Sequence, residues 1–117
     1  MTTIKNLQKE VLKFRNERDW AQFHNPKDSA IAMVSEAVEV LDHFKWKNER
    51  EIQTFLAKNK KKVGDELADV FFWVLLMSYD LGIDLISAFR EKMKENAQKY
   101  PIERAKGSNI KYTEFEK

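Results

Sequence analysis

Two pairs of acidic residues interrupt the most apolar stretches of this sequence. Glu36 and Glu39 lie in the run 30–41, and Glu66 and Asp69 lie in a second run that continues to residue 77. Residues three apart share a face of an α-helix and stand about one turn from each other. We therefore expect two helices, each carrying two carboxylates on one side.

On a helical projection, each pair of acids forms a narrow stripe along its helix, and hydrophobic residues border both of these acidic stripes. A pair of acids at this spacing is most often a solvated helix face. Stripes this narrow instead favour a lined pocket, where carboxylates are costly unless they are paired or bind a metal. Hard oxygen ligands from two helices suit Mg²⁺, with Mn²⁺ as a substitute, better than zinc. The pattern therefore predicts a metal-dependent enzyme.

The composition narrows the possible classes of protein. A chain of 117 residues can bury one core, so we expect a single domain over residues 1–117. The net charge of +2 gives no electrostatic reason to bind a nucleic-acid polymer. The lack of cysteine excludes disulfides and thiolate metal sites. The start lacks a signal-peptide core, and the longest apolar run, 70–77, is too short to span a membrane. We expect a cytoplasmic protein with no membrane contact.

Apolar periodicity and helix-ending residues predict an all-α fold, a helical bundle of about four helices per chain. Pro26 suits the first turn of a helix, Gly82 suits the position after a helix end, and Asp84 suits an N-cap. Residues 47–59 are expected to be a short weak helix or a loop, and residues 102–117 a C-terminal arm. The four expected helices are 4–18, 26 to between 44 and 46, 60–81, and 84–100.

The third expected helix bears on assembly. Its residues 70–77 are apolar in all directions around the helix axis, so no single apolar stripe exists. Either this helix lies at the centre of the bundle, or part of it pairs with another chain. Exposed apolar patches of that size usually mark interfaces, which favours a homo-oligomer.

Five ordered segments resemble the MazG-type all-α nucleoside triphosphate pyrophosphohydrolases, especially the dCTP pyrophosphatases among them. The two acidic pairs match the E-x-x-E…E-x-x-D signature of that family. The similarity runs from about residue 14 to residue 115. Besides the signature, the matching segments are 18–26, 44–47, 92–101 and 111–114.

This resemblance implies an activity and an assembly. The activity is hydrolysis of a (deoxy)nucleoside triphosphate, either dCTP or a modified pyrimidine deoxynucleotide, to the monophosphate and pyrophosphate, a house-cleaning of the nucleotide pool. The helices would pair with those of another subunit into four-helix bundles, in a dimer or a tetramer. Glu36, Glu39, Glu66 and Asp69 would hold Mg²⁺, and we expect Glu36 to orient the attacking water.

Aromatic and polar residues around the acidic stripes are the candidates for binding the nucleotide. Trp20 and Trp46 flank the first acidic helix, and Trp73 lies one turn beyond the last acid. An indole face stacks well on a nucleobase. The resemblance also places His24 at the nucleotide and Asn96 near the phosphates or the sugar. Each tryptophan has core packing as its alternative role, and His24 has capping of the next helix.

Two positions depart from the pattern of the dCTP pyrophosphatases. Those enzymes carry a tyrosine where this chain has Trp73 and a histidine where it has Val11, so metal binding transfers more safely than base preference. They also do not need His43, which we expect to be either in solvent or beside a metal ligand without touching the metal.

Two other kinds of protein were compared with this pattern. A carboxylate-bridged di-iron bundle uses Glu-x-x-His, and neither acidic pair has histidine at that spacing. A non-catalytic helical interaction module would explain the apolar third helix, but it would leave the acidic pairs without a purpose.

Overall fold

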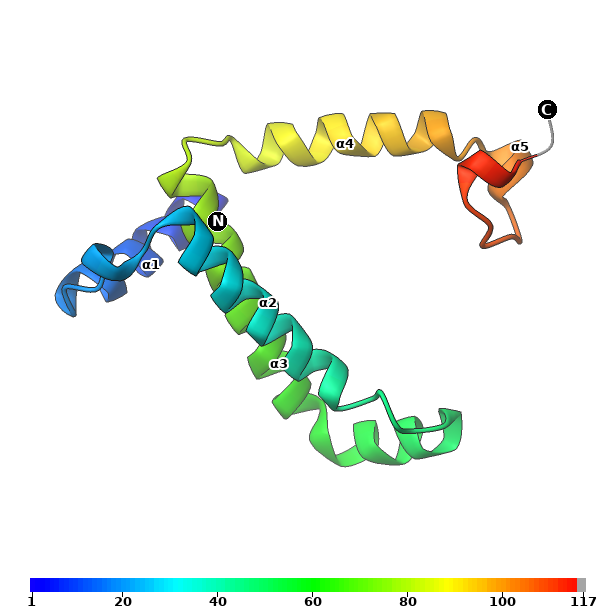
Figure 1. Ribbon diagram of the computed structural model, residues 1–117, viewed down its shortest axis with the longest axis horizontal. Coiled ribbons are helices and arrows are strands. Elements are labelled where there is room, and N and C mark those ends of the chain that lie inside the picture. The colour runs from blue at the N-terminus through cyan, green and yellow to red at the C-terminus, as the bar shows by residue number, and fades with distance from the viewer. Residues whose placement is uncertain (116–117) are drawn as a thin grey trace. The chain divides into compact units, whose positions relative to one another are not determined.

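A computed structural model describes residues 1–115 of the chain, and within them every regular element is a helix (Figure 1). The all-α prediction is therefore confirmed. The helices are α1 (Ile4–Glu17), α2 (Pro26–Asp42), α3 (Glu49–Asp80), α4 (Leu85–Lys99) and α5 (Ile102–Ala105), with short 3₁₀ turns at Ala21–Phe23 and Tyr112–Glu114. The last two residues of the predicted arm, 116–117, lie outside the described part.

The chain forms two compact units, residues 1–83 and the residues from 84 onwards. The first unit holds α1, α2 and α3, and the second holds α4, α5 and the last 3₁₀ turn. The expectation of a single domain over the whole chain stays a prediction. Within the described residues, no single helix is both long enough and apolar enough to cross a membrane.

Local capping explains where the helices begin. Asn25 accepts a hydrogen bond from the backbone of Asp28 and precedes Pro26, so α2 begins where the sequence indicates. Asp84 caps α4 in the same way, through the backbone N–H of Ser87. After α3, Gly82 takes a φ of +67°, which glycine adopts without strain.

The third helix differs from the prediction. It begins at Glu49 rather than at residue 60, because Asn48 and Glu51 form a reciprocal capping box. The predicted weak helix or loop over 47–59 is therefore mostly the first part of α3. At Asn59 the backbone leaves helical geometry (φ −126°, ψ 20°) and the helix kinks. The second helix is shorter than predicted and ends at Asp42, because residues 43–46 form turns.

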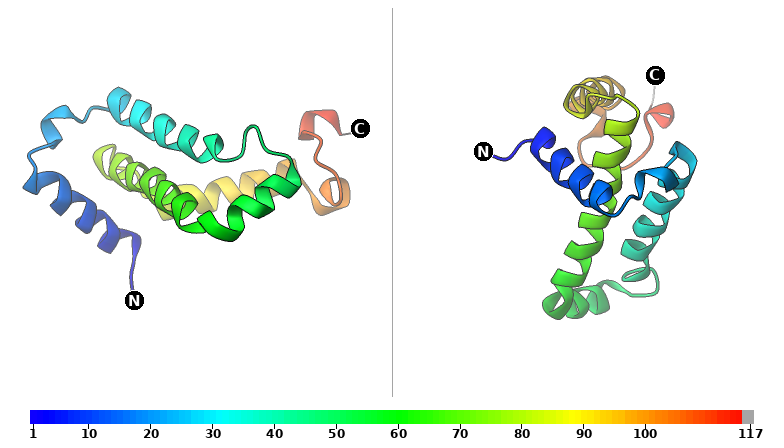
Figure 2. Two further views of the ribbon diagram at one scale, coloured as in Figure 1. Left: turned by 90° about the horizontal axis from the view of Figure 1, so that it is seen from below. Right: turned by 90° about the vertical axis from the view of Figure 1, so that its left-hand side faces the viewer.

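The core of the first unit lies where α1 crosses the C-terminal half of α3. Val11, Leu75 and Leu76 are buried there, with Leu7 and Phe72 among the side chains packed around them. Figures 1 and 2 show α2 running beside α3, while α1 crosses only the C-terminal part of α3. The facing sides of α2 and α3 are therefore brought together along most of the length of α2.

A partly buried ion pair joins α1 to the end of α3. Arg15 donates from both terminal nitrogens to the two carboxylate oxygens of Asp80, at 2.8 and 3.0 Å. Gln8 adds hydrogen bonds to the Ser78 hydroxyl and to the Leu75 carbonyl. These polar contacts fix how α1 lies on α3, and the sequence analysis did not anticipate them.

Candidate active site

The four predicted acidic ligands meet between α2 and α3. Glu36 and Glu39 come from α2, and Glu66 and Asp69 come from α3. Burial raises the pKa of Glu36 above its ordinary value, and the neighbouring charges of Glu39, Asp69 and Glu66 raise this pKa further. Glu36 is therefore close enough to each of the other three carboxylates to be repelled by it, although the pairs are about thirty residues apart in the sequence.

One oxygen of this cluster lacks a partner. Oε2 of Glu36 is buried and accepts no hydrogen bond. A buried, unpaired carboxylate oxygen among three other acids is costly, and a cation would relieve that cost. As the side chains stand, no three His, Asp or Glu residues within 1–115 are arranged to hold a metal ion. The donor set fits a hard divalent cation, provided that the carboxylates turn towards it.

His43 takes part in this cluster. Its Nε2 is hydrogen-bonded to Oε2 of Glu66, and both side chains are mostly buried, at 18% and 21% exposed. The sequence left two positions open for His43, in solvent or beside a metal ligand. The structure shows the second, since His43 contacts the carboxylate of Glu66. The phenyl ring of Phe55, against which His43 packs, was missed because residues 47–59 were not expected to reach the acidic stripe.

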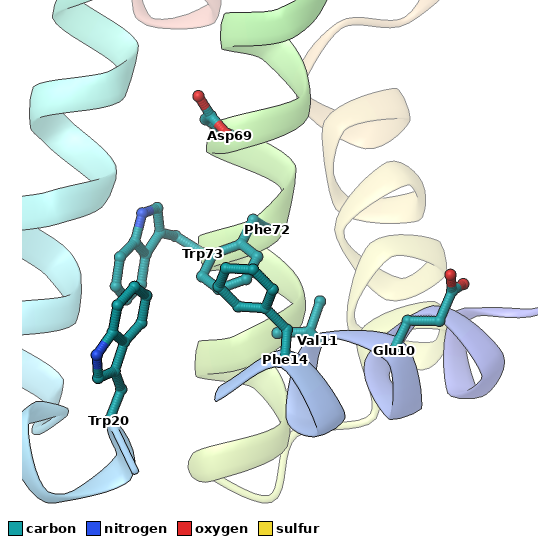
Figure 3. Close-up of a pocket in the computed structure, with 7 residues that line it drawn as sticks. All are labelled: Glu10, Val11, Phe14, Trp20, Asp69, Phe72 and Trp73. Atoms are coloured by element: carbon teal, nitrogen blue, oxygen red, sulfur yellow. The ribbon is translucent and has the colours of Figure 1, made fainter. Parts of the chain in front are cut away.

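An apolar cavity opens beside the acidic cluster. It has a volume of about 520 Å³, and Trp20, Trp73 and Asp69 all line it (Figure 3). In Figure 3 the two indoles lie on one side of α3, with Asp69 one turn before Trp73. The remaining lining residues are Glu10, Val11, Phe14 and Phe72.

This cavity joins a carboxylate of the acidic cluster to two of the three predicted aromatic residues. Trp73 also packs against the core, so its predicted and alternative roles coincide. Phe14 and Phe72 were missed as lining residues because their periodicity indicated only core packing. Val11, noted as a departure from the dCTP pyrophosphatases, lies in the same cavity as Trp73.

His24 lies in a different cavity. This cavity, of about 320 Å³, is lined also by Arg15 and Asp80. The imidazole packs edge-on against Trp73, with ring centroids 5.2 Å apart. Burial lowers the pKa of His24, the Arg15 charge lowers it further, and the Asp80 charge opposes both. Asn25 caps α2, so the alternative that His24 is the cap is wrong.

Trp46 is not among the residues that line the cavity of Trp20 and Trp73. Trp46 follows α2 and is 86% exposed, and the Lys45 ammonium lies 5.7 Å from the centre of its ring. Asn96 is on α4, in the second compact unit. Their assignment to the nucleotide stays a prediction.

Comparisons with known proteins agree with this arrangement. The profile of the MazG-like family matches residues 31–115. Two similar curated proteins are dCTP pyrophosphatase 1 of Rattus norvegicus, 33% identical, and of Homo sapiens, 32% identical, over 115 residues each. Each alignment covers 97% of this chain and 68% of the relative.

A solved structure is also similar. The crystal structure of a pyrophosphatase from Archaeoglobus fulgidus superposes with a TM-score of 0.80 at 31% identity, covering 86% of this chain and 94% of the other. The predicted enzyme class, a nucleoside triphosphate pyrophosphohydrolase, is confirmed by these matches. With the family profile covering most of the chain, and relatives about one-third identical over nearly all of it, this protein belongs to the MazG-like family.

Proposed function

We propose that this protein hydrolyses a deoxynucleoside triphosphate, dCTP or a modified pyrimidine deoxynucleotide, to the monophosphate and pyrophosphate, with Mg²⁺ as cofactor. The printed names of the relatives, dCTP pyrophosphatase and pyrophosphatase, support this activity. The observation that carries the proposal is the convergence of four carboxylates around a buried, unpaired oxygen of Glu36. A role in removing unwanted nucleotides from the pool follows from such a reaction. The cytoplasmic location stays a prediction.

The acidic side chains of the cluster have two roles in the reaction, binding the cation and accepting a proton. Glu36, Glu39, Glu66 and Asp69 would hold the cation, which when bound neutralises phosphate charge and lowers the pKa of water. Attack of water on the α-phosphorus forms one P–O bond while the bond from phosphorus to the oxygen bridging to the β-phosphate breaks. Glu36 orients that water and accepts its proton, since Oε2 of its carboxylate has no hydrogen-bond partner within the protein.

The apolar cavity would take the base. Trp20 and Trp73 offer stacking surfaces within the same cavity as Asp69, so a base there and phosphates at the acids would fit one nucleotide. We assign His24, Trp46 and Asn96 to the same nucleotide on the resemblance to dCTP pyrophosphatases. A homo-oligomer, dimer or tetramer, would complete the helical bundle.

Turnover by acid-to-amide variants tests the metal site. Glu39→Gln and Asp69→Asn should abolish release of pyrophosphate at saturating Mg²⁺, while the helical circular-dichroism spectrum is unchanged. Asp65→Asn is the matched control, because Asp65 is exposed on the same helix and pairs with Lys61. Near-normal activity in either cluster variant would refute the site. A wild type that hydrolyses no nucleotide with Mg²⁺ or Mn²⁺ would favour the helical interaction module.

The base assignment needs a separate measurement. Values of kcat/KM for the four dNTPs, their ribose analogues and methylated or damaged forms should rank cytosine-type deoxynucleotides first. Trp20→Ala should raise KM and flatten this ranking, with a smaller loss in kcat than the acidic variants show. A wild type that prefers purines would leave the metal chemistry standing and remove the stacking arrangement.

A further inference from the structure

The hydrogen bond between His43 and Glu66 has no role in the proposed reaction as described above. His43 follows the last residue of α2, and Glu66 is in the middle of α3, so the bond links the two helices at the acidic cluster. A carboxylate can only accept a hydrogen bond, so the proton of this contact is on Nε2 of the imidazole. One oxygen of Glu66, Oε2, is thereby engaged.

The imidazole is itself held from several sides. Its ring packs on Phe55, with centroids 5.1 Å apart and planes 31° apart, and meets the edge of Phe44. The Lys47 ammonium donates to the backbone carbonyl of His43 and lies 4.7 Å from the centre of the Phe55 ring. Few rotamers remain for a half-buried side chain with these neighbours. The ring therefore presents Nε2 to Glu66 in a fixed direction.

His43 also connects the two segments of α3 on either side of its kink. Phe55 belongs to the segment of α3 before Asn59, and Glu66 to the segment after it. His43 thus touches both segments, through its ring face and through Nε2. Groups that orient a metal-binding carboxylate in this way commonly change metal affinity about 10- to 100-fold when they are removed.

We propose that His43 is a positioning residue for the acidic cluster: its Nε2–H fixes the Glu66 carboxylate and leaves the second oxygen for the divalent cation. The proposal rests on the metal site of the proposed function. The same hydrogen bond gives one of the four carboxylates a fixed donor before a cation binds. His43 itself touches neither nucleotide nor cation.

Direct titration with a divalent ion tests this role without relying on turnover. The Kd for Mn²⁺ is measured by electron paramagnetic resonance on the full chain without nucleotide, for wild type, His43→Leu and His43→Gln. Leucine removes the donor and keeps a similar volume, whereas the glutamine amide places a donor at a similar reach. We expect His43→Leu to weaken Mn²⁺ binding by about tenfold and His43→Gln to restore it to within about threefold.

Steady-state kinetics give a second readout. His43→Leu should require a higher Mg²⁺ concentration for half-maximal activity, with kcat at saturating Mg²⁺ and KM for the nucleotide nearly unchanged. Ser35→Ala is the control, because it removes a side-chain hydrogen bond to the Ile31 carbonyl on the same helix without touching the acids. An unchanged Kd in His43→Leu, or an equal loss in the leucine and glutamine variants, would overturn the proposal.

The tautomer of His43 in the wild type gives a third readout. The chain has two histidines, so His24→Gln assigns their ¹⁵N resonances. Nε2 of neutral His43 should carry the proton, and a resonance pattern with the proton on Nδ1 would overturn the proposal. Glu39→Gln and Glu66→Gln separate the two hypotheses. If both keep wild-type Mn²⁺ affinity, the metal site fails, whereas loss in these variants with none in His43→Leu removes only the positioning role.

Discussion

At Glu36, burial and three neighbouring carboxylates all oppose ionisation of one side chain. The folded protein therefore holds the Glu36 proton more tightly than the unfolded chain does. The stability of the protein without metal then falls as the pH rises from the ordinary pKa of 4.5 through the raised folded value. A cluster that is unfavourable when empty and ionised is one that a cation stabilises.

Replacement of this acid should make the metal-free protein more stable. At pH 7.5 with EDTA, we expect Glu36→Gln to raise Tm by roughly 2–5 °C over wild type. The difference should shrink below about pH 4.5, where the wild-type carboxyl is protonated in both states. Added Mg²⁺ should raise Tm of the wild type only. A variant that is less stable than wild type at neutral pH would contradict this account.

Arg15 and Asp80 form an ion pair, and their side chains are buried to different extents. The Arg15 side chain is 8% exposed and the Asp80 side chain 29%, so water can partly solvate the acid but not the guanidinium. Loss of one partner of a buried pair leaves the other charge without compensation. The two single substitutions should therefore differ in cost.

We expect Asp80→Asn to be the more damaging change. It leaves a buried guanidinium unpaired and should lower the free energy of unfolding by about 3 kcal/mol, whereas Arg15→Met should cost about half as much. Urea unfolding measures both values. Because His24 lies beside this pair, Asp80→Asn should also lower the pKa of His24 further, which NMR titration detects. A larger cost for Arg15→Met would contradict the burial argument.

At the scale of a single helix, the kink of α3 at Asn59 affects the site. At Asn59 the side-chain amide donates to the Phe55 carbonyl at 2.9 Å, in a half-buried position. The amide thus satisfies a carbonyl of the turn before the kink, where the backbone has left helical geometry. A short local contact of this kind holds Phe55 where it meets His43.

Asn59→Ala should destabilise the protein although alanine is the better helix former. We expect a loss of about 1 kcal/mol, because the Phe55 carbonyl loses its partner and the kink is no longer held. Thr54→Ala is the comparison, since the exposed Thr54 hydroxyl bonds the Arg50 carbonyl within regular helix and its loss should be neutral or stabilising. Stabilisation of both variants in urea would show that the kink is not held by Asn59.

At the scale of the whole molecule, many large hydrophobic side chains are exposed and few are buried. Only Val11, Leu75 and Leu76 among the hydrophobic side chains of the described residues are buried. On α2, the stripe facing away from the acids is exposed along its length and consists of Ile31, Val34, Val38 and Leu41. Exposed stripes of this kind usually mark an interface.

This exposure supports the proposed homo-oligomer and gives a way to test it. Sedimentation at micromolar concentration should find a dimer or tetramer, and Val34→Lys should shift the chain towards monomer and lower Tm. Gln53→Lys, the same change of charge at an exposed polar position of α3, should leave assembly intact. A stable wild-type monomer of 13.9 kDa would remove the proposal.

The sequence by itself determined the features that depend on neighbouring residues. The starts at Pro26 and Asp84 and the end before Gly82 agree with the structure, because caps and helix periodicity act within one or two turns. The beginning of α3 was missed although Asn48 and Glu51 carry its signal, since the polar segment that follows has weak apolar periodicity.

Only the tertiary structure decided which side chains meet. The packing of α2 on α3 brings Glu36 close to Asp69, and it sets His43 against Glu66. It likewise places His24 in a cavity with Arg15, apart from the cavity of the two indoles. These contacts join residues from different segments of the chain. Their geometry depends on how the helices cross, which periodicity along one helix does not determine.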